Sequence, residues 1–164
     1  MEGELKVSGV DCSDLFNLKK SPISFKDNPR NHIPTYGSMV YTIWNNSNEW
    51  IYVGIGGIGR SPTTPLIKRN PISRILQHKS GRRSGDQFCI YVHDYYVIPN
   101  LDINEYVFDK GYLDNLTKEF INNELFYRFL VIQEENSIQL VRSIEDQLKT
   151  GLKDYGKPLL NGVP

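Results

Sequence analysis

The hydrophobic pattern changes from strand-like to helix-like along the chain, and its clearest strand signal lies between residues 40 and 53. Residues 40–44 and 50–53 are rich in β-branched and aromatic side chains, and the NNSN between them is typical of a turn. This pattern predicts a β-hairpin. With a two-residue loop at its tip, Tyr41 would lie directly opposite Tyr52 on one face of the sheet, either as an ordinary packing pair or as part of a site.

A helix is predicted after the glycine-rich loop that follows this hairpin. The segment NPISRILQHKSG begins with Asn70 as an N-cap, and Gly81 follows its end. Arg74 and His78 are four residues apart, so they share one helix face at the margin of the apolar stripe. They are interpreted either as surface residues or as a pair that reaches along the sheet toward its neighbours.

The rest of the pattern completes an α+β fold. Residues 86–99 are apolar almost throughout and fit either a strand or a buried helix. Further on, a helix, a buried strand and a second helix are expected at residues 111–125, 126–133 and 136–152. The order predicts a small three-stranded sheet, antiparallel or mixed, that is flanked by helices and interrupted by an insertion at about residues 86–125. Residues 1–37 are interpreted as an N-terminal extension, and residues 38–164 as one domain.

The net charge of zero conceals an asymmetric distribution. No acidic residue lies between Glu49 and Asp86, although that interval holds seven of the 19 basic residues. Such a run is either a solvated face or a surface for a polyanion such as nucleic acid, because Lys and Arg neutralise phosphates. The seven residues are Arg60, Lys68, Arg69, Arg74, Lys79, Arg82 and Arg83.

Composition also bears on the compartment. No apolar run approaches the roughly 18 residues of a membrane span, and the acidic start MEGEL is unlike a signal peptide. The two cysteines, Cys12 and Cys89, have neither zinc-ligand spacing nor a disulfide-dense setting. The sequence therefore predicts a cytoplasmic protein with no membrane partner and no structural zinc.

The loop GIGGIG satisfies the GxGxxG spacing of dinucleotide-binding proteins. That motif requires a helix at the last glycine and an acidic residue about 20 positions later. Here Ser-Pro and Thr-Pro pairs follow, and the expected acidic position falls within the basic interval. The glycines are therefore interpreted as letting the backbone leave the sheet and approach another group closely.

Glu145 is anomalous because it falls inside an apolar stripe, where a carboxylate is costly without a partner. Either it forms an ion pair with Arg142 or Lys149, or it is a metal ligand or an acid–base group. The second interpretation is favoured because both cations lie off the stripe. The apolar residues of that helix face are Ile138, Val141, Ile144, Leu148 and Leu152.

Five separated elements, taken together, resemble the GIY-YIG family of nucleases over residues 38 to about 162. The first motif departs from the family name because Met-Val stands where Gly-Ile is expected. Order and spacing agree for all five elements, which makes the resemblance more specific than any one of them. The matching elements are Met39-Val40-Tyr41, Tyr52-Val53-Gly54, Arg74 and His78 in RILQH, Glu145 in SIEDQL and Asn161 in KPLLNG.

The resemblance implies a divalent-metal-dependent DNA endonuclease that hydrolyses phosphodiester bonds. Tyr41 would activate or position the attacking water, Tyr52 would orient it, and His78 would relay the proton. Arg74 would contact the scissile phosphate. Glu145 would bind one Mg²⁺, or another divalent ion such as Mn²⁺.

The same resemblance assigns supporting roles. Gly54 and Asn161 would organise the site, and a homodimer would help a nuclease with one site per chain to cut both strands. The alternative is a non-catalytic nucleic-acid-binding protein on the same fold. Either function would bind DNA through the basic residues Arg60, Lys68, Arg69, Lys79, Arg82 and Arg83.

Overall fold

The computed structural model describes residues 5–104, 109 and 111–161 and has the predicted α+β class. Its main sheet is antiparallel, with strand order β3-β6-β4-β5. The sequence predicted three strands, whereas the sheet has four because β3 from the N-terminal segment pairs with β6. The strands of this sheet are β3 (Ile23–Ser24), β4 (Ser38–Asn45), β5 (Trp50–Gly56) and β6 (Leu125–Ile132).

The hairpin formed by β4 and β5 was predicted correctly in its strands but not in its register. Tyr41 pairs with Gly54 and Tyr52 with Ile43, so the two tyrosines are diagonal neighbours rather than directly opposite. The loop is longer than predicted because Asn48 adopts a left-handed φ of 57°, and a register shift follows Ile43. Both phenol rings still lie on one face, with centroids 6.5 Å apart.

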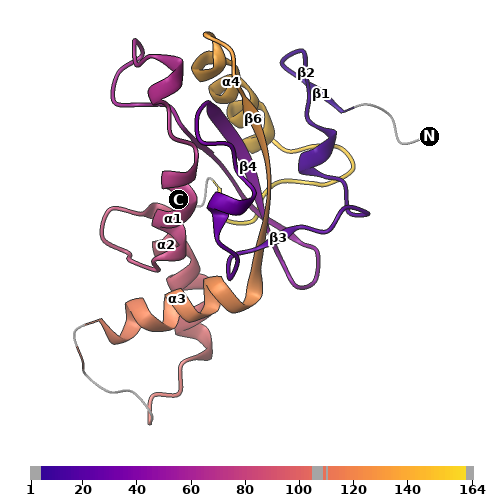
Figure 1. Ribbon diagram of the computed structural model, residues 1–164. Coiled ribbons are helices and arrows are strands. Elements are labelled where there is room, and N and C mark those ends of the chain that lie inside the picture. The colour runs from indigo at the N-terminus through magenta and orange to yellow at the C-terminus, as the bar shows by residue number, and fades with distance from the viewer. Residues whose placement is uncertain (1–4, 105–108, 110, 162–164) are drawn as a thin grey trace.

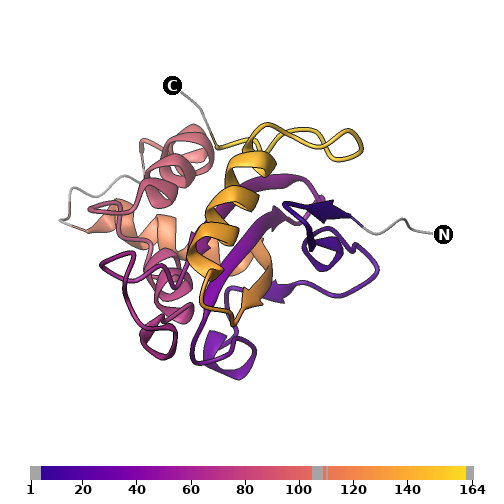
Figure 2. The ribbon, with the colours of Figure 1, turned by 90° about the horizontal axis from the view of Figure 1, so that it is seen from above.

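Helices cover both faces of the sheet (Figures 1 and 2). Helix α1 begins at Ile72, one residue later than predicted, with Pro71 rather than Asn70 at the N-cap position; Asn70 Oδ1 still accepts a hydrogen bond from the backbone N–H of Ile72 at 3.1 Å. The ambiguous run at residues 86–99 is helical, because Asp86 accepts a hydrogen bond from Phe88 N–H and caps a new helix. The helices are α1 (Ile72–Lys79), α2 (Gln87–Val92), a π-helical turn (His93–Val97), α3 (Tyr112–Glu124) and α4 (Ser137–Lys149).

Two hydrophobic cores follow from this layering. One lies between the sheet and helices α1, α2 and α3 and includes Tyr41 and Tyr52. The other lies between the sheet and α4. The N-terminal segment belongs to the folded unit, because Phe16 is buried in the second core and Phe25 in the first.

Short elements connect these layers. A two-stranded sheet near the N-terminus lies beside α4, where Ser8 Oγ is 2.7 Å from Ser143 Oγ (Figure 2). None of the helices in the described part of the chain has the length and apolar character that crossing a bilayer requires. The short elements are β1 (Lys6–Val7), β2 (Val10–Asp11) and 3₁₀ turns at Ser13–Leu15, Pro29–Asn31, Leu66–Lys68 and Ile98–Asn100.

Candidate active site

A cavity of about 550 Å³ opens beside β5, where the strand runs into the glycine-rich loop. Four of the five residues predicted to be catalytic line it, and each comes from a different element: Tyr41 from β4, Tyr52 from β5, Arg74 from α1 and Glu145 from α4. Their positions in the sequence span more than 100 residues, so only the fold brings them together.

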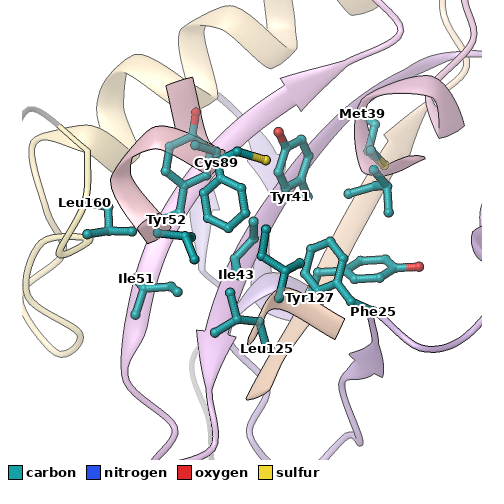
Figure 3. Close-up of a cluster of buried hydrophobic side chains, with 14 of the residues drawn as sticks. Phe25, Met39, Tyr41, Ile43, Ile51, Tyr52, Cys89, Leu125, Tyr127 and Leu160 are labelled. Carbon is teal, nitrogen blue, oxygen red and sulfur yellow. The ribbon is translucent and has the colours of Figure 1, made fainter. Parts of the chain in front are cut away.

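Tyr41 is fully buried in the first core, and Figure 3 shows its hydroxyl at the same end of the cluster as that of Tyr52. Gly54 makes this position available. A Cβ atom on Gly54 would lie 2.4 Å from Tyr41 Oη and 2.9 Å from Tyr52 Cε1, well inside van der Waals contact. The glycine of the second motif therefore leaves room for the tyrosine of the first.

Behind Tyr41, a chain of short hydrogen bonds leads away from the cavity. Tyr41 Oη lies 2.6 Å from His78 Nε2, and His78 Nδ1 lies 2.7 Å from Asp86 Oδ2. All three side chains are almost completely buried. His78, predicted at the margin of the helix stripe, thus reaches the cavity through the Tyr41 hydroxyl.

Asp86 is the residue of this group that sequence reasoning missed. Its signal was present but weak, because an Asp before an apolar run is a helix N-cap and Asp86 ends the acid-free interval. Its distance from His78 depends on the turn between α1 and α2, where Gly81 and Gly85 have φ values of 69° and 80°. No periodic pattern encodes that turn.

Burial sets the protonation states of these groups. It raises the pKa of Tyr41 well above its usual range, and the neighbouring Tyr52 adds to the rise while the Arg74 guanidinium opposes it. It also raises the pKa of Tyr52 to about 12. Burial lowers the pKa of His78, although Asp86 opposes that change. Near neutral pH both phenols are therefore protonated and the imidazole is neutral.

Asp86 remains ionised in this setting. Burial opposes its charge, but the hydrogen bonds from His78 and Cys89 and the charge of Arg74 together hold the pKa of Asp86 below its usual range. Cys89 Sγ lies 3.3 Å from the same carboxylate oxygen that faces His78. Both carboxylate oxygens of Asp86 therefore have hydrogen-bond donors, Phe88 N–H at Oδ1 and the side chains of His78 and Cys89 at Oδ2.

Arg74 lies half-buried on α1 at the cavity wall. Its Nη1 donates a hydrogen bond to Gln77 Oε1 at 2.9 Å, which fixes the guanidinium along the helix. Since Tyr41 and Asp86 both raise the pKa of Arg74 against the effect of burial, the guanidinium keeps its charge. It is a positive group beside the phenols, with donors suited to a phosphate.

Glu145 projects from the apolar face of α4, as predicted. The residues Ile138, Val141, Ile144 and Leu148 of that face are buried, whereas Leu152 lies beyond the helix end. Lys149 Nζ is 3.2 Å from Glu145 Oε1, so the ion pair considered from the sequence is present. Burial raises the pKa of Glu145, and Lys149 opposes that rise.

The donors around Glu145 decide which metal the cavity could hold. Among the described residues, no group of three or more His, Cys, Asp and Glu side chains could enclose a metal ion. Glu145 is the carboxylate among the residues that line the cavity, and one carboxylate fits Mg²⁺ or Mn²⁺, because Mg²⁺ is commonly held by one or two carboxylates together with water and substrate phosphates.

Asn161 lies at the open edge of β5. Its Oδ1 accepts a hydrogen bond from Val53 N–H at 2.6 Å, and its Nδ2 donates to Val53 O at 2.9 Å. The backbone of Leu159 and Leu160 also donates to β5, at Trp50 O and Ile51 O. The Asn161 side chain therefore binds the backbone of Val53, the residue between Tyr52 and Gly54. This contact supports the strand and does not reach into the cavity.

The basic residues separate into two groups. Arg60, Lys68 and Arg82 are exposed, and the first two line the cavity. Arg69 is 4% exposed and its guanidinium donates to the carbonyls of Thr64, Glu134 and Glu135, so the prediction that it binds nucleic acid is replaced by a structural role.

Lys79 and Arg83 are already engaged. Lys79 Nζ donates to the backbone carbonyls of Lys26 and Asp27, both at 2.9 Å. Arg83 Nε lies 2.6 Å from Asp114 Oδ1. A phosphate would have to compete with these partners, whereas it would meet Arg60 and Lys68 unobstructed.

The glycine-rich loop does not open a helix, as a dinucleotide site would require. After β5 the next helical element is the 3₁₀ turn Leu66–Lys68, seven residues beyond Gly59.

Comparisons with known proteins found no match, because no family model, no curated protein and no solved structure matches the chain. The likeness to GIY-YIG nucleases therefore rests on the motif residues alone.

Proposed function

We propose that the protein is a divalent-metal-dependent endonuclease that hydrolyses phosphodiester bonds in DNA, with a site of the GIY-YIG type. One observation carries this proposal: Tyr41, Tyr52, Arg74 and Glu145 converge from four elements on one cavity. Phosphodiester hydrolysis needs an activated water, charge relief on the phosphate and help for the leaving oxygen. These four side chains cover those requirements.

Each residue takes the role that the resemblance implies, and its surroundings are compatible with that role. Tyr41, whose hydroxyl already has a proton acceptor in His78, takes the proton of the attacking water, and Tyr52 orients that water. Arg74 binds the non-bridging oxygens of the scissile phosphate. Glu145 would hold Mg²⁺ or Mn²⁺, which when bound would supply Lewis-acid polarisation of the phosphate and charge relief at the leaving oxygen.

The substrate class follows from charge and access. The exposed side chains of Arg60 and Lys68 stand on the cavity wall beside Arg74, which makes three cations around one opening. A nucleic-acid backbone supplies the repeated negative charge that such a surface attracts. Phosphate contacts of this kind position a duplex without reading its sequence.

The alternative, a non-catalytic nucleic-acid-binding protein, uses the same cations. It has no need for two buried phenols and a carboxylate in the cavity that the cations surround. Burial of Glu145 works against its charge, and a binding surface for phosphates would gain from losing that charge. The presence of all four groups therefore favours the enzyme.

Cleavage of supercoiled plasmid DNA tests the proposal. Wild-type protein should nick and linearise the plasmid with Mg²⁺ or Mn²⁺ and should leave it intact in EDTA. Arg74→Ala should lower the rate about 100-fold or more, as loss of a charge-stabilising group typically does. Arg142→Ala, which removes an exposed arginine from α4, is the control and should cut normally. Plasmid binding without any cleavage in either metal would establish the non-catalytic alternative.

A further inference from the structure

Asp86 uses its two carboxylate oxygens for different purposes. Oδ1 accepts a hydrogen bond from Phe88 N–H at 3.1 Å and so caps helix α2. Oδ2 lies 2.7 Å from His78 Nδ1. A cap needs one oxygen and tolerates exposure, whereas this carboxylate is 1% exposed and aimed at an imidazole. Capping α2 therefore does not account for the contact with His78.

The contact fixes where the proton of His78 lies. An ionised carboxylate accepts hydrogen bonds and donates none, so Nδ1 must carry the proton that joins His78 to Asp86. In the neutral ring, Nε2 is then an unprotonated acceptor. The 2.6 Å contact with Tyr41 must run from the phenol O–H to Nε2. The two hydrogen bonds therefore donate in the same direction, from Tyr41 to His78 and from His78 to Asp86. The ionised carboxylate of Asp86 sets that direction.

We infer that Asp86 is a positioning residue that holds His78 in the Nδ1-protonated tautomer, so that Nε2 takes the Tyr41 proton when the phosphodiester is cleaved. This inference rests on the proposed nuclease function. It concerns a residue outside the cavity, whose effect on the proton transfer passes through His78.

The proton transfers balance as follows. The water oxygen forms a bond to phosphorus while the bond from phosphorus to the leaving oxygen breaks, and the leaving oxygen takes a proton from solvent. The water gives its proton to Tyr41 Oη as the Tyr41 proton passes to His78 Nε2. His78 becomes an imidazolium and Asp86 stays ionised. After product release the extra proton returns through Tyr41 to solvent.

The surroundings of His78 explain why a carboxylate is needed. The ring packs against Phe88, Tyr52 and Tyr41, with ring centroids 4.6, 6.0 and 5.6 Å away. The other charge acting on it is the cation of Arg74, which disfavours an imidazolium. Without the negative charge of Asp86, a buried imidazolium would be uncompensated. His78 could then not take the Tyr41 proton. Burial raises the pKa of Tyr41, so the phenol would stay protonated.

Asp86→Asn separates the two uses of the residue. Asn is as good an N-cap as Asp, so its Oδ1 can still accept from Phe88 N–H. Its Nδ2 then faces His78 and donates to Nδ1, which forces the proton to Nε2. Long-range ¹H–¹⁵N spectra of the three histidines, with His78 identified by His78→Gln, report the tautomer directly. Wild type should show Nδ1–H, and Asp86→Asn should show Nε2–H.

Cleavage kinetics supply the second readout. Asp86→Asn should lower kcat about 100-fold or more with KM within about twofold, because a wrong tautomer removes the acceptor while leaving the cavity unchanged. In a His78→Gln background the same substitution should change kcat less than about threefold, since the group it acts through is gone. Asp11→Asn, the same substitution at an exposed aspartate near the N-terminus, should leave kcat unchanged.

The outcomes are distinct. A wild-type spectrum with Nε2–H overturns the inference whatever the cleavage assay gives. Full kcat in Asp86→Asn, or a loss that adds fully to that of His78→Gln, overturns it as well. If wild-type protein cuts no DNA, the nuclease function fails, whereas the pair of spectra still decides whether Asp86 sets the tautomer.

Discussion

Gly54→Ala adds a single methyl group at the contact between β5 and Tyr41. The new Cβ would lie 2.4 Å from Tyr41 Oη and 2.6 Å from Tyr41 Cζ, whereas ordinary contact begins near 3.4 Å. The hydroxyl must therefore move by about 1 Å, the difference between those distances. The φ of Gly54 is not in the left-handed region, so alanine meets no backbone strain there. The effect is purely steric.

Two effects lower the free energy of unfolding of Gly54→Ala. Overpacking a core by a methyl group costs about 1 to 3 kcal/mol. A 1 Å shift of Tyr41 also weakens its 2.6 Å hydrogen bond to His78, for about 1 kcal/mol more. We expect Gly54→Ala to lower the free energy of unfolding by about 2 to 4 kcal/mol and to slow cleavage about 100-fold, as a 1 Å misplacement in an active site typically does.

Urea denaturation measures the first quantity and plasmid nicking at a fixed folded concentration the second. Leu15→Ala is the matched control, because it removes a fully buried side chain from the second core at a similar cost of about 2 to 5 kcal/mol. Its cleavage per folded molecule should be normal. If Gly54→Ala lost activity only in proportion to its unfolded fraction, as Leu15→Ala should, the link between this glycine and Tyr41 would be refuted.

Three further changes test the same site. Tyr41→Phe should lower the cleavage rate about 100-fold or more with near-normal folding. The control Tyr127→Phe removes a buried hydroxyl that has no hydrogen-bond partner in the described part of the chain and should cleave normally; equal rates for the two variants would mean that Tyr41 contributes only packing. Glu145→Gln should abolish metal-dependent cleavage but change the free energy of unfolding without metal by less than about 1 kcal/mol, because its partner Lys149 is 41% exposed and stays solvated. A metal-independent loss of about 3 to 5 kcal/mol in the free energy of unfolding would contradict the ligand role. Since the pKa of Tyr52 rises from 10.0 to about 12, the free energy of unfolding should keep its full Tyr52 contribution below pH 10 and fall by about 1.4 kcal/mol per pH unit between pH 10 and pH 12. Chemical denaturation should therefore show the stabilities of wild type and Tyr52→Phe diverging across that range, and parallel pH dependences would refute the shift.

Most elements of the fold could be predicted from local sequence signals. The hairpin strands, the capped helix α1 and the stripe of α4 were predictable because each depends on residues a few positions apart. The hairpin register was not predictable, since it depends on the left-handed backbone of Asn48 and on a bulge beyond Ile43. Neither feature follows from the alternation of hydrophobic and polar residues, so the pattern alone did not fix the register.

The site shows the same division. Tyr41, Tyr52, Arg74 and Glu145 were predictable from motif spacing, although only the fold places them on one cavity. Asp86 could not be paired with His78 because the turn between them has no periodicity.

Arg69 illustrates a different obstacle. It was grouped with exposed cations on charge alone, yet its guanidinium donates to carbonyls 65 and 66 residues away. Counting charges cannot distinguish a surface residue from one that closes a loop.

The hydrogen bonds between Asn161 and Val53 join residues 108 positions apart, and that separation has a consequence for synthesis. Both tyrosines are synthesised before Glu145 and Asn161, because they precede them in the chain. Until then, β5 presents an unpaired edge of Trp50, Ile51 and Val53, which invites pairing between nascent chains. Any activity that depends on Glu145 would therefore appear only after that residue has been made, and a pause in synthesis between β5 and residues 159–161 would lengthen the exposure of this edge to aggregation.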